Sequence, residues 1–263
     1  MTAPIRLVAT DLDGTLLGAG GVVSPRTVEA IEAVVASGIQ VVAATGRSQW
    51  TAEPLLEPVN GVDLVVCSNG ASLYDLRQRA SLAEHPIADA VIDEILVRLG
   101  QGLPGCFYGW ETAADLHYEQ RFIAYRPGLD RPASPDLPIG ERPVPIRKLM
   151  IAHDEVHHVG LLDALLPLMP DACLATTSGA SFVEVTGDGV DKAFGVQQVC
   201  AAAGIGAHEV LAFGDHHNDV SMLRWAGRGI AMGNAHEVVR SAVEETTLGH
   251  LDDGVAVVLE ALL

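Results

Sequence analysis

Short apolar runs alternate with an amphipathic segment near the start of the chain. Residues 5–10, 39–45 and 63–69 are apolar stretches that end in small polar residues, which is typical of buried parallel strands. Ser24 and Pro25 suit the N-cap and first position of a helix. Apolar residues then recur at positions 28, 31, 34 and 35 before Gly38. The pattern predicts strand, helix and strand, followed by a further strand.

The same alternation returns after Asp191. The pattern predicts helix in "KAFGVQQVCAAAG", strand in "EVLAFGD", helix in "DVSMLRWAG", strand in "GIAMG", helix in "HEVVRSAV" and a last helix from Asp252. Strands that alternate with helices form parallel sheets covered by helices on both faces. Both ends of the chain therefore belong to one doubly wound α/β domain with a parallel sheet.

The middle of the chain has a different pattern. It predicts a helix from Pro86, two strands, a loop, a strand, a helix over 155–169 and two more strands. Consecutive strands indicate antiparallel pairing, so we expect an α+β cap over 84–186, inserted into a core of 1–83 and 187–263. Six aromatic residues over 106–125 fit strand packing better than a wall facing substrate. Trp110, Glu111 and His117 are the candidates for substrate contact in this region.

The charge and cysteine composition limits which binding partners and which kind of protein the sequence is compatible with. The chain has 34 acidic and 16 basic residues, a net charge of −18, which argues against nucleic acid or an anionic membrane as partner. The four cysteines are far apart and read as reduced thiols. The sequence has neither the pattern of a signal peptide nor an apolar run long enough to span a membrane. We expect a cytoplasmic protein, a monomer or a homodimer.

Two carboxylates follow the first predicted strand. In "DLDGT", Asp11 and Asp13 are two positions apart, so their side chains can point the same way. Carboxylates this close raise each other's proton affinity, and one can then attack while the other carries a proton for a leaving group. The pentapeptide alone also fits a capped turn with solvated acids.

Three further polar stretches follow predicted strands or begin a helix. Thr45 and Gly46, in "ATGRS", offer a hydroxyl and backbone amides for a phosphate. Lys192 begins a predicted helix and is one of only two lysines beside fourteen arginines, which indicates a need for a compact charge. Asp215, Asn218 and Asp219 lie in "GDHHNDVSM". The carboxyl edge of an open α/β sheet is where ligands bind.

The stretch "GDHHNDVSM" admits two interpretations. His216 and His217 suggest a zinc site, whereas the acids and the asparagine suggest magnesium, which prefers hard oxygen ligands. Asp11, a backbone carbonyl and Asp215 meet the magnesium requirement, so we favour Mg²⁺. Substrate contact is then the better expectation for the two histidines.

Taken together, the stretches "DLDGTLL", "ATGRS", "SNGA", "GVDKA", "GDHHNDVSML", "AMGNA" and "DDGVAVVLEAL" resemble the haloacid dehalogenase (HAD) superfamily, and more narrowly its Cof-type, class IIB phosphatases. The resemblance implies that Asp11 is the nucleophile and Asp13 the general acid and base. It implies that Thr45, Lys192 and Asn69 hold the phosphoryl group.

For the metal, the resemblance implies that Asp215, Asp11 and the carbonyl of Asp13 bind Mg²⁺. Asn218 and Asp219 then ligate the ion or orient its ligands. The chain departs from the family in having Ala193 where a glycine usually follows the lysine.

The leading hypothesis is a Mg²⁺-dependent phosphatase of small phosphorylated metabolites, sugar phosphates or related phosphomonoesters, that acts through an aspartyl-phosphate. The alternative within the same class is a sugar phosphomutase or a pathway-specific sugar-phosphate phosphatase. The alternative from another class is a catalytically silent module that binds a metabolite.

Overall fold

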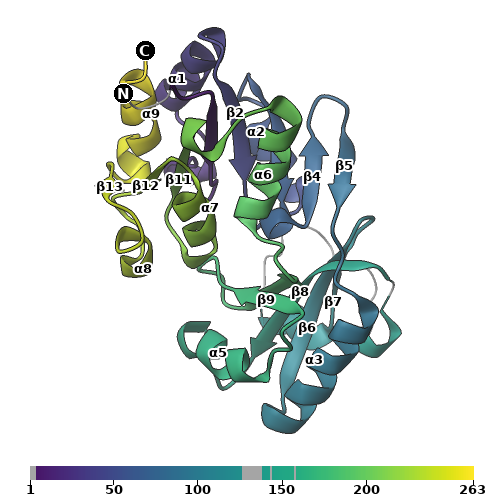
Figure 1. Ribbon diagram of the computed structural model, residues 1–263. Helices are drawn as coiled ribbons and strands as arrows, with labels where there is room; N and C mark the ends of the chain where they lie inside the picture. Colours follow the sequence, from purple (N-terminus) through teal and green to yellow (C-terminus); the bar gives the residue numbers. More distant parts are fainter. Residues whose placement is uncertain (1–3, 126–137, 143, 157) are drawn as a thin grey trace. The chain divides into compact units, whose positions relative to one another are not determined.

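The computed structural model describes residues 4–125, 138–142, 144–156 and 158–263 (Figure 1). The chain divides into two compact units, one formed by Met1–Ala83 with Asp191–Leu263 and the other by Glu84–Val190. We call them the core unit and the cap unit and describe each by itself.

The core unit is built on an eight-stranded sheet in the order β13-β12-β11-β1-β2-β3-β4-β5. Its strands are β1 (Leu7–Thr10), β2 (Gln40–Ala44), β3 (Val62–Cys67), β4 (Ser72–Asp75), β5 (Ala80–Glu84), β11 (Val210–Gly214), β12 (Arg228–Ala231) and β13 (Glu245–Thr246). The pairs from β13 to β3 are parallel, and β4 runs antiparallel to β3.

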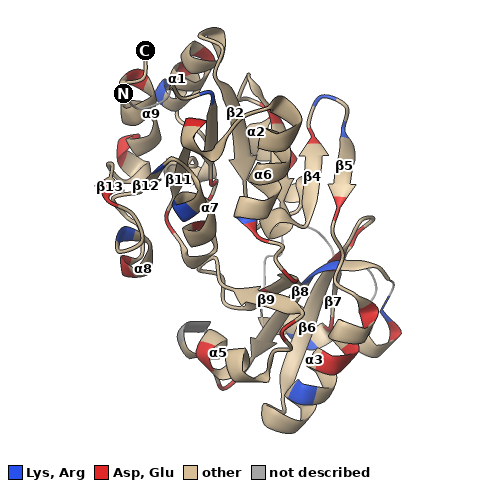
Figure 2. Ribbon diagram, in the orientation of Figure 1, with Lys and Arg blue, Asp and Glu red and all other residues tan. Residues whose placement is uncertain are grey.

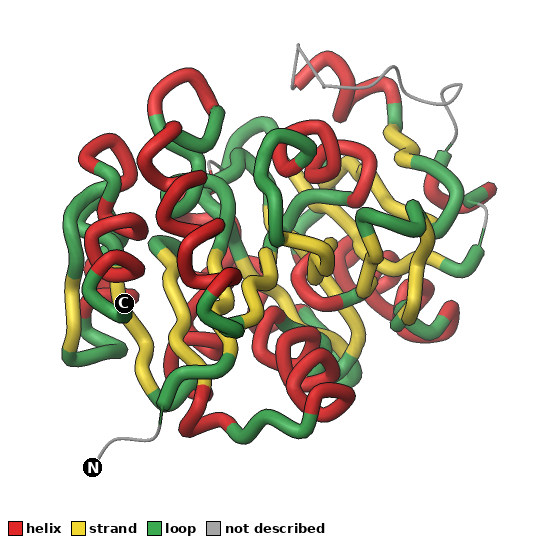
Figure 3. Tube along the Cα trace, turned by 90° about the horizontal axis from the view of Figure 1, so that it is seen from above, coloured by secondary structure: helices red, strands yellow, loops and turns green. Residues whose placement is uncertain are grey.

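Helices lie on both sides of this sheet (Figure 3). They are α1 (Pro25–Ala36), α2 (Gln49–Leu56), α6 (Lys192–Ala203), α7 (Val220–Trp225), α8 (Glu237–Arg240) and α9 (Gly254–Glu260). Contacts join α1 with α9 and α6 with α7. With both faces covered, β1, β2 and β11 are almost continuously buried and apolar, as the sequence pattern predicts for parallel strands. The doubly wound core is confirmed.

Local chemistry sets where α1 begins. The Ser24 hydroxyl accepts a hydrogen bond from the Thr27 amide at 3.1 Å, and Pro25 occupies the first turn, where its missing N–H is not needed. Thr27, Ala30, Ile31 and Val34 form the buried face. This helix starts and ends where its apolar spacing predicts.

The sequence pattern did not predict four elements of the core unit. They are α2, the strand pair β4 and β5, and the two-residue strand β13. Helix α2 carries Pro54 and β5 is largely exposed, so neither has the regular apolar spacing that marks a buried element.

The cap unit is built on a five-stranded sheet in the order β7-β6-β8-β10-β9. Its strands are β6 (Cys106–Thr112), β7 (Leu116–Tyr118), β8 (Ile146–His153), β9 (Cys173–Thr176) and β10 (Val183–Gly187), and its helices are α3 (Asp89–Gly102), α4 (Gln120–Tyr125) and α5 (His158–Leu165). All its pairs are antiparallel, which confirms the expected α+β insert. Helix α5 is shorter than predicted, since Leu166–Leu168 continue as a 3₁₀ turn.

Aromatic side chains of the cap unit pack mainly against one another. Phe122 contacts Phe107, Tyr118 and Phe182 with ring centroids 5.4–6.1 Å apart. Trp110 is fully buried and stacks on His117 at 5.6 Å. Edge-to-face and offset contacts of this kind stabilise a core beyond the area they bury. The packing interpretation of the aromatic segment therefore accounts for these rings.

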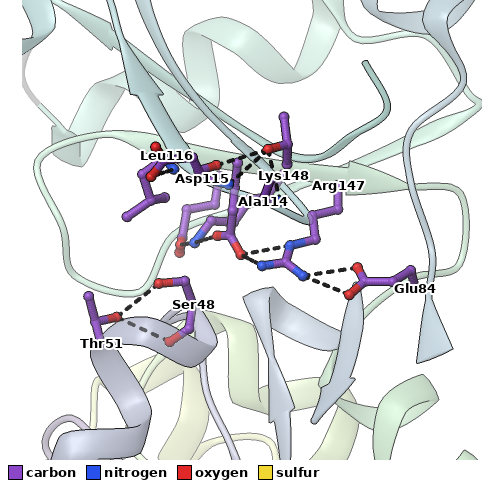
Figure 4. Close-up of polar contacts among 11 residues, drawn as sticks. Ser48, Thr51, Glu84, Ala114, Asp115, Leu116, Arg147 and Lys148 are labelled. Atoms are coloured by element: carbon purple, nitrogen blue, oxygen red, sulfur yellow. Dashed lines mark hydrogen bonds and ion pairs between the residues drawn. The ribbon is translucent and has the colours of Figure 1, made fainter. Parts of the chain in front are cut away.

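Charged side chains of the cap unit form a network around Arg147 and Lys148, which are both buried. Arg147 donates to Glu84 at 2.9 Å and to Glu111 at 2.8 Å (Figure 4). Lys148 donates to Glu184 at 3.1 Å, and its Nζ lies 3.7 Å from Glu111 Oε2. Removing one partner of a buried pair leaves a charge without compensation, at a cost of about 3–5 kcal/mol.

Acidic residues are spread over both units, for example along α3 (Figure 2). Among the residues that the structure describes, no helix is long and apolar enough to cross a membrane.

Candidate functional site

The polar stretches singled out in the sequence converge at one edge of the core sheet. Asp11 follows β1, Thr45 follows β2, Asn69 follows β3 and Asp215 follows β11. These four strands are neighbours and parallel, so their carboxyl ends lie together. After β1, the chain forms β2 and β3 on one side of β1, and the later strand β11 pairs with β1 on its other side. Asp11 therefore lies at the point where the strand order reverses, which is where ligands bind in open α/β sheets.

Lys192 joins two of the acids. Its Nζ lies 2.6 Å from Asp11 Oδ1 and 2.6 Å from Asp219 Oδ1, and all three side chains are buried. The two carboxylates raise the pKa of Lys192 against the opposing effect of burial, so the ammonium group stays charged. Asp191 positions this lysine, because its carboxylate accepts from the Phe194 amide and caps α6.

Asp219 fixes the loop that follows β11. Its Oδ2 accepts hydrogen bonds from the backbone amides of Asp215 and His216, each at 2.9 Å. Its Oδ1 accepts from Lys192. With both oxygens engaged, Asp219 is suited to orienting Asp215 and Lys192, which is one of the two roles that the family resemblance implies for it.

Asp11, Asp215 and Asp219 form a cluster of acids. Each offers a carboxylate oxygen within 4.8 Å of the other two. Burial raises the pKa of Asp11 well above its ordinary value, an effect that Lys192 opposes. Burial, helped by Asp219, raises the pKa of Asp215 to about 7. One lysine does not balance three carboxylates, so the cluster has the oxygen donors and the excess negative charge that suit Mg²⁺.

A glycine lets the backbone approach Asp215. Gly14 has φ +76°, and a Cβ at this position would lie 2.2 Å from Asp215 Oδ2. The Thr15 hydroxyl donates to Asp215 Oδ1 at 3.3 Å, and Asn234 donates to the Gly14 carbonyl at 2.8 Å. Only glycine fits between the first acidic loop and Asp215.

Two asparagines meet beside this cluster. Asn218 Nδ2 donates to Asn69 Oδ1 at 2.9 Å, and both side chains are buried. Among the described residues, Asn69 Nδ2 and Asn218 Oδ1 have no hydrogen-bond partner. The Asn69 amide donates to the Thr45 carbonyl at 2.9 Å, which ties the ends of β2 and β3 together. A buried amide with an unused donor suits a polar ligand such as a phosphoryl oxygen.

Asp13 lies apart from the acid cluster and is bound by Arg47. Two hydrogen bonds of 2.6 and 2.7 Å join the guanidinium to the carboxylate, and both side chains are partly exposed. The Arg47 amide donates to the Thr45 hydroxyl at 3.1 Å. Gly46 lies between these two residues in the same turn. The bidentate pairing fixes the direction of the Asp13 carboxylate.

A family model described as haloacid dehalogenase-like hydrolase matches residues 8–259, nearly the whole chain. The chain belongs to this family. The resemblance drawn from the motifs is thereby confirmed, and this HAD-family chain is a hydrolase by its membership.

Curated relatives of similar length are named phosphatases. One is 5-amino-6-(5-phospho-D-ribitylamino)uracil phosphatase YcsE of Bacillus subtilis, 27% identical over 96% of this chain and 93% of the relative. Another is pyridoxal phosphate phosphatase YbhA of Escherichia coli, 26% identical over 95% of this chain and 96% of the relative.

Solved structures share the fold across both units. The phosphatase BT1666 of Bacteroides thetaiotaomicron has a TM-score of 0.82 and 26% identity, covering 98% of this chain and 95% of its own. The HAD subclass IIB sugar phosphatase BT4131 has a TM-score of 0.85 and 23% identity, covering 98% of this chain and 100% of its own, and supports the fold.

The HAD-family site has residues to which sequence reasoning gave no role. Arg47, Asn234 and Thr15 lie in the quoted stretches "ATGRS", "AMGNA" and "DLDGT". Each of them follows a strand, and this position was the sign in the sequence that they could belong to the site. Their partners Asp13, Gly14 and Asp215 come from other strands, and no sequence spacing indicates such pairs.

Proposed function

We propose that the protein is a Mg²⁺-dependent phosphatase that hydrolyses small phosphorylated metabolites, sugar phosphates or related phosphomonoesters, through an aspartyl-phosphate. The observation that carries the proposal is the arrangement of Asp11 at the switch point of the sheet, held by Lys192 and clustered with Asp215 and Asp219. Membership of the HAD-like hydrolases and the names of the curated relatives support it.

Asp11 is the nucleophile in this proposal. Its carboxylate attacks phosphorus, the bond from phosphorus to the ester oxygen breaks, and the leaving oxygen takes a proton from Asp13. Attack requires the ionised form of Asp11. Lys192, 2.6 Å away, opposes the rise in pKa that burial causes and so favours that form.

Asp13 is the general acid and then the base that deprotonates the water attacking the acyl phosphate. In the free protein its carboxylate is paired with Arg47. A carboxyl group that carries a proton binds a guanidinium weakly, so this pair has to open before Asp13 donates. Partial exposure of both side chains makes that opening inexpensive.

The phosphoryl oxygens are assigned to Lys192, to the Thr45 hydroxyl with the Gly46 amide, and to the paired amides of Asn69 and Asn218. The unused polar atoms of these two asparagines support this assignment. Preorganised donors stabilise charge where it develops in the transition state.

Mg²⁺ would be held by Asp11, Asp215 and the backbone carbonyl of Asp13, with Asn218 and Asp219 orienting these ligands. When bound, it offsets negative charge on the phosphoryl oxygens and on the acid cluster. We assign selection of the leaving group to the cap unit. The relatives named for phosphorylated ribityl and pyridoxal compounds support a small phosphorylated substrate.

Replacing the nucleophile tests the proposal. We expect Asp11→Asn to lower kcat for p-nitrophenyl phosphate with Mg²⁺ by at least ~10³-fold, because an amide does not form the acyl phosphate. The matched control is Asp63→Asn, which removes a carboxylate of the same unit that pairs with Arg77 at the surface.

A near wild-type rate for Asp11→Asn would refute the nucleophile assignment. Chelation of Mg²⁺ should abolish turnover, and adding Mg²⁺ back should restore it. With a hexose 1-phosphate as substrate, free hexose and phosphate indicate hydrolysis, whereas a hexose 6-phosphate indicates a mutase.

A further inference from the structure

Three histidine rings gather beside the loop that follows β11. The ring centroids of His216 and His217 are 4.9 Å apart, those of His217 and His236 are 4.4 Å apart, and those of His216 and His236 are 5.9 Å apart. His216 and His217 are half-buried and His236 is exposed. The proposed phosphatase chemistry uses none of these rings.

The backbone holds the three histidines in place. The amide of His216 donates to Asp219 Oδ2 at 2.9 Å, and the amide of His236 donates to the Asp215 carbonyl at 2.9 Å. These bonds attach the start of α8 to the loop after β11. The rings are therefore neighbours because of fixed main-chain positions in two segments of the core unit.

The nitrogens of the first two rings have the spacing of a chelating pair. His217 Nδ1 lies 3.4 Å from His216 Nδ1. Zinc binds imidazole nitrogen at about 2.0–2.1 Å with tetrahedral angles, which separates two ligand nitrogens by about 3.3–3.4 Å. A dication that replaces the contact between the two nitrogens therefore needs little movement of either ring.

The third ring lies close enough to offer a further nitrogen if its side chain rotates. His236 Nδ1 accepts a bond of 3.3 Å from the Val238 amide, which is long for such a bond. Within the described residues, the group of three ligand atoms already within 4.8 Å of one another is that of Asp11, Asp215 and Asp219. As placed, His216 and His217 offer two neighbouring nitrogens, and a rotation of the exposed His236 side chain would add a third.

We propose that His216 and His217, with His236 as third ligand, bind a borderline transition-metal dication such as Zn²⁺ or Ni²⁺. The site is separate from the oxygen site for Mg²⁺, because imidazole suits zinc and nickel whereas carboxylate and carbonyl oxygens suit magnesium. The neighbouring acid cluster attracts cations to this edge of the sheet. This proposal is an alternative to the expectation that these histidines contact substrate.

Zinc binding in the presence of saturating Mg²⁺ tests the proposal without measuring phosphatase activity. The metal-free full chain is titrated with Zn²⁺ against a chromogenic chelator. The variants are His216→Gln, His217→Gln and His236→Gln, and the control is His208→Gln, which removes an exposed histidine of the same unit. Circular dichroism verifies that each variant is folded.

We expect one zinc ion per chain in the wild type and in His208→Gln. Loss of a residue that only contacts a metal ligand weakens metal binding by roughly 10-fold to 100-fold. His216→Gln and His217→Gln remove ligands themselves, so each should weaken zinc binding by at least this factor. Equal zinc affinity in all variants, or complete displacement of zinc by Mg²⁺, would overturn the proposal and leave the two histidines as a hydrogen-bonded pair.

X-ray absorption at the zinc edge of the wild-type protein gives an independent answer. We expect two or three imidazole nitrogens in the first coordination shell. A shell of oxygen atoms alone would place the zinc in the acid cluster and refute the histidine site. Because neither measurement uses turnover, failure of this proposal and failure of the phosphatase proposal are distinguishable.

Discussion

The two lysines of the chain have the same surroundings in different units. Lys192 lies between Asp11 and Asp219, and Lys148 lies near Glu111 and Glu184, with both ammonium groups buried. The chain otherwise uses arginine for its basic residues. A compact ammonium group acts as a point charge that can contact one carboxylate on each side.

Because the two lysines have similar surroundings, replacing each of them can distinguish an effect on protein stability from an effect on Mg²⁺ binding. Lys192→Met should lower the free energy of unfolding without Mg²⁺ by about 3–5 kcal/mol, because two buried carboxylates lose their counter-charge. The same change should enlarge the rise in Tm that Mg²⁺ produces, since the acid cluster becomes more negative. Differential scanning calorimetry with and without Mg²⁺ measures both effects.

Lys148→Met is the matched control for that prediction. It also removes a buried ammonium group, so the protein should lose stability, but its carboxylates belong to the cap unit. The rise in Tm with Mg²⁺ should therefore equal that of the wild type. An equal rise in all three proteins would mean that the metal does not bind at the acid cluster.

At the scale of elements, the junction of β3 with α6 determines the position of Lys192. Gly70 has φ +97°, and a Cβ at this position would lie 2.0 Å from the Asp191 carbonyl oxygen. Asp191 caps α6, and Lys192 is the first residue of that helix. The turn after β3 is therefore packed directly against the residue that caps α6.

We expect Gly70→Ala to displace the start of α6 and lower kcat by roughly 10²-fold, the loss that follows when a catalytic group moves by about 1 Å. Gly20→Ala is the control, because Gly20 has φ +75° and no neighbouring atom within 4 Å of a Cβ. This change should cost about 1 kcal/mol of stability and leave kcat unchanged. Steady-state kinetics measure kcat of both variants, and urea unfolding measures their stability. Equal kcat values for the two variants would contradict the idea that Gly70 sets the position of Lys192.

For the whole molecule, the cap unit has its own hydrophobic core. That core includes Trp110, Leu149 and Val185, from β6, β8 and β10. A unit with an independent core and few chain crossings meets the conditions for folding alone. The other two tryptophans, Trp50 and Trp225, belong to the core unit.

We therefore propose that a fragment of residues 84–190 folds by itself. Its single tryptophan should fluoresce at shorter wavelength than in denaturant, because Trp110 is fully buried. Urea should shift the emission in one cooperative transition. Emission already at the wavelength of exposed tryptophan without urea would show that the cap unit needs the core unit to fold.

The pattern of apolar and polar residues predicted the class of fold, and the motifs predicted which polar residues would meet at one edge of the core sheet. Buried strands such as β1 and β2 can be predicted because they are runs of apolar residues. The start of α1 can be predicted because its N-cap, Ser24, lies next to the helix in the sequence. Parallel strands bring their carboxyl ends together, so acids that follow separate strands were expected to meet.

Only the tertiary structure decided which side chains pair. The bond from Arg47 to Asp13, the two bonds of Lys192 and the meeting of His217 with His236 join residues that lie far apart along the chain. The edge strand β5 was not predicted either, because a strand without buried residues does not need an alternation of apolar and polar side chains. Local sequence encodes burial and backbone preference, whereas contact between distant side chains depends on the packed arrangement of the strands and helices that carry them.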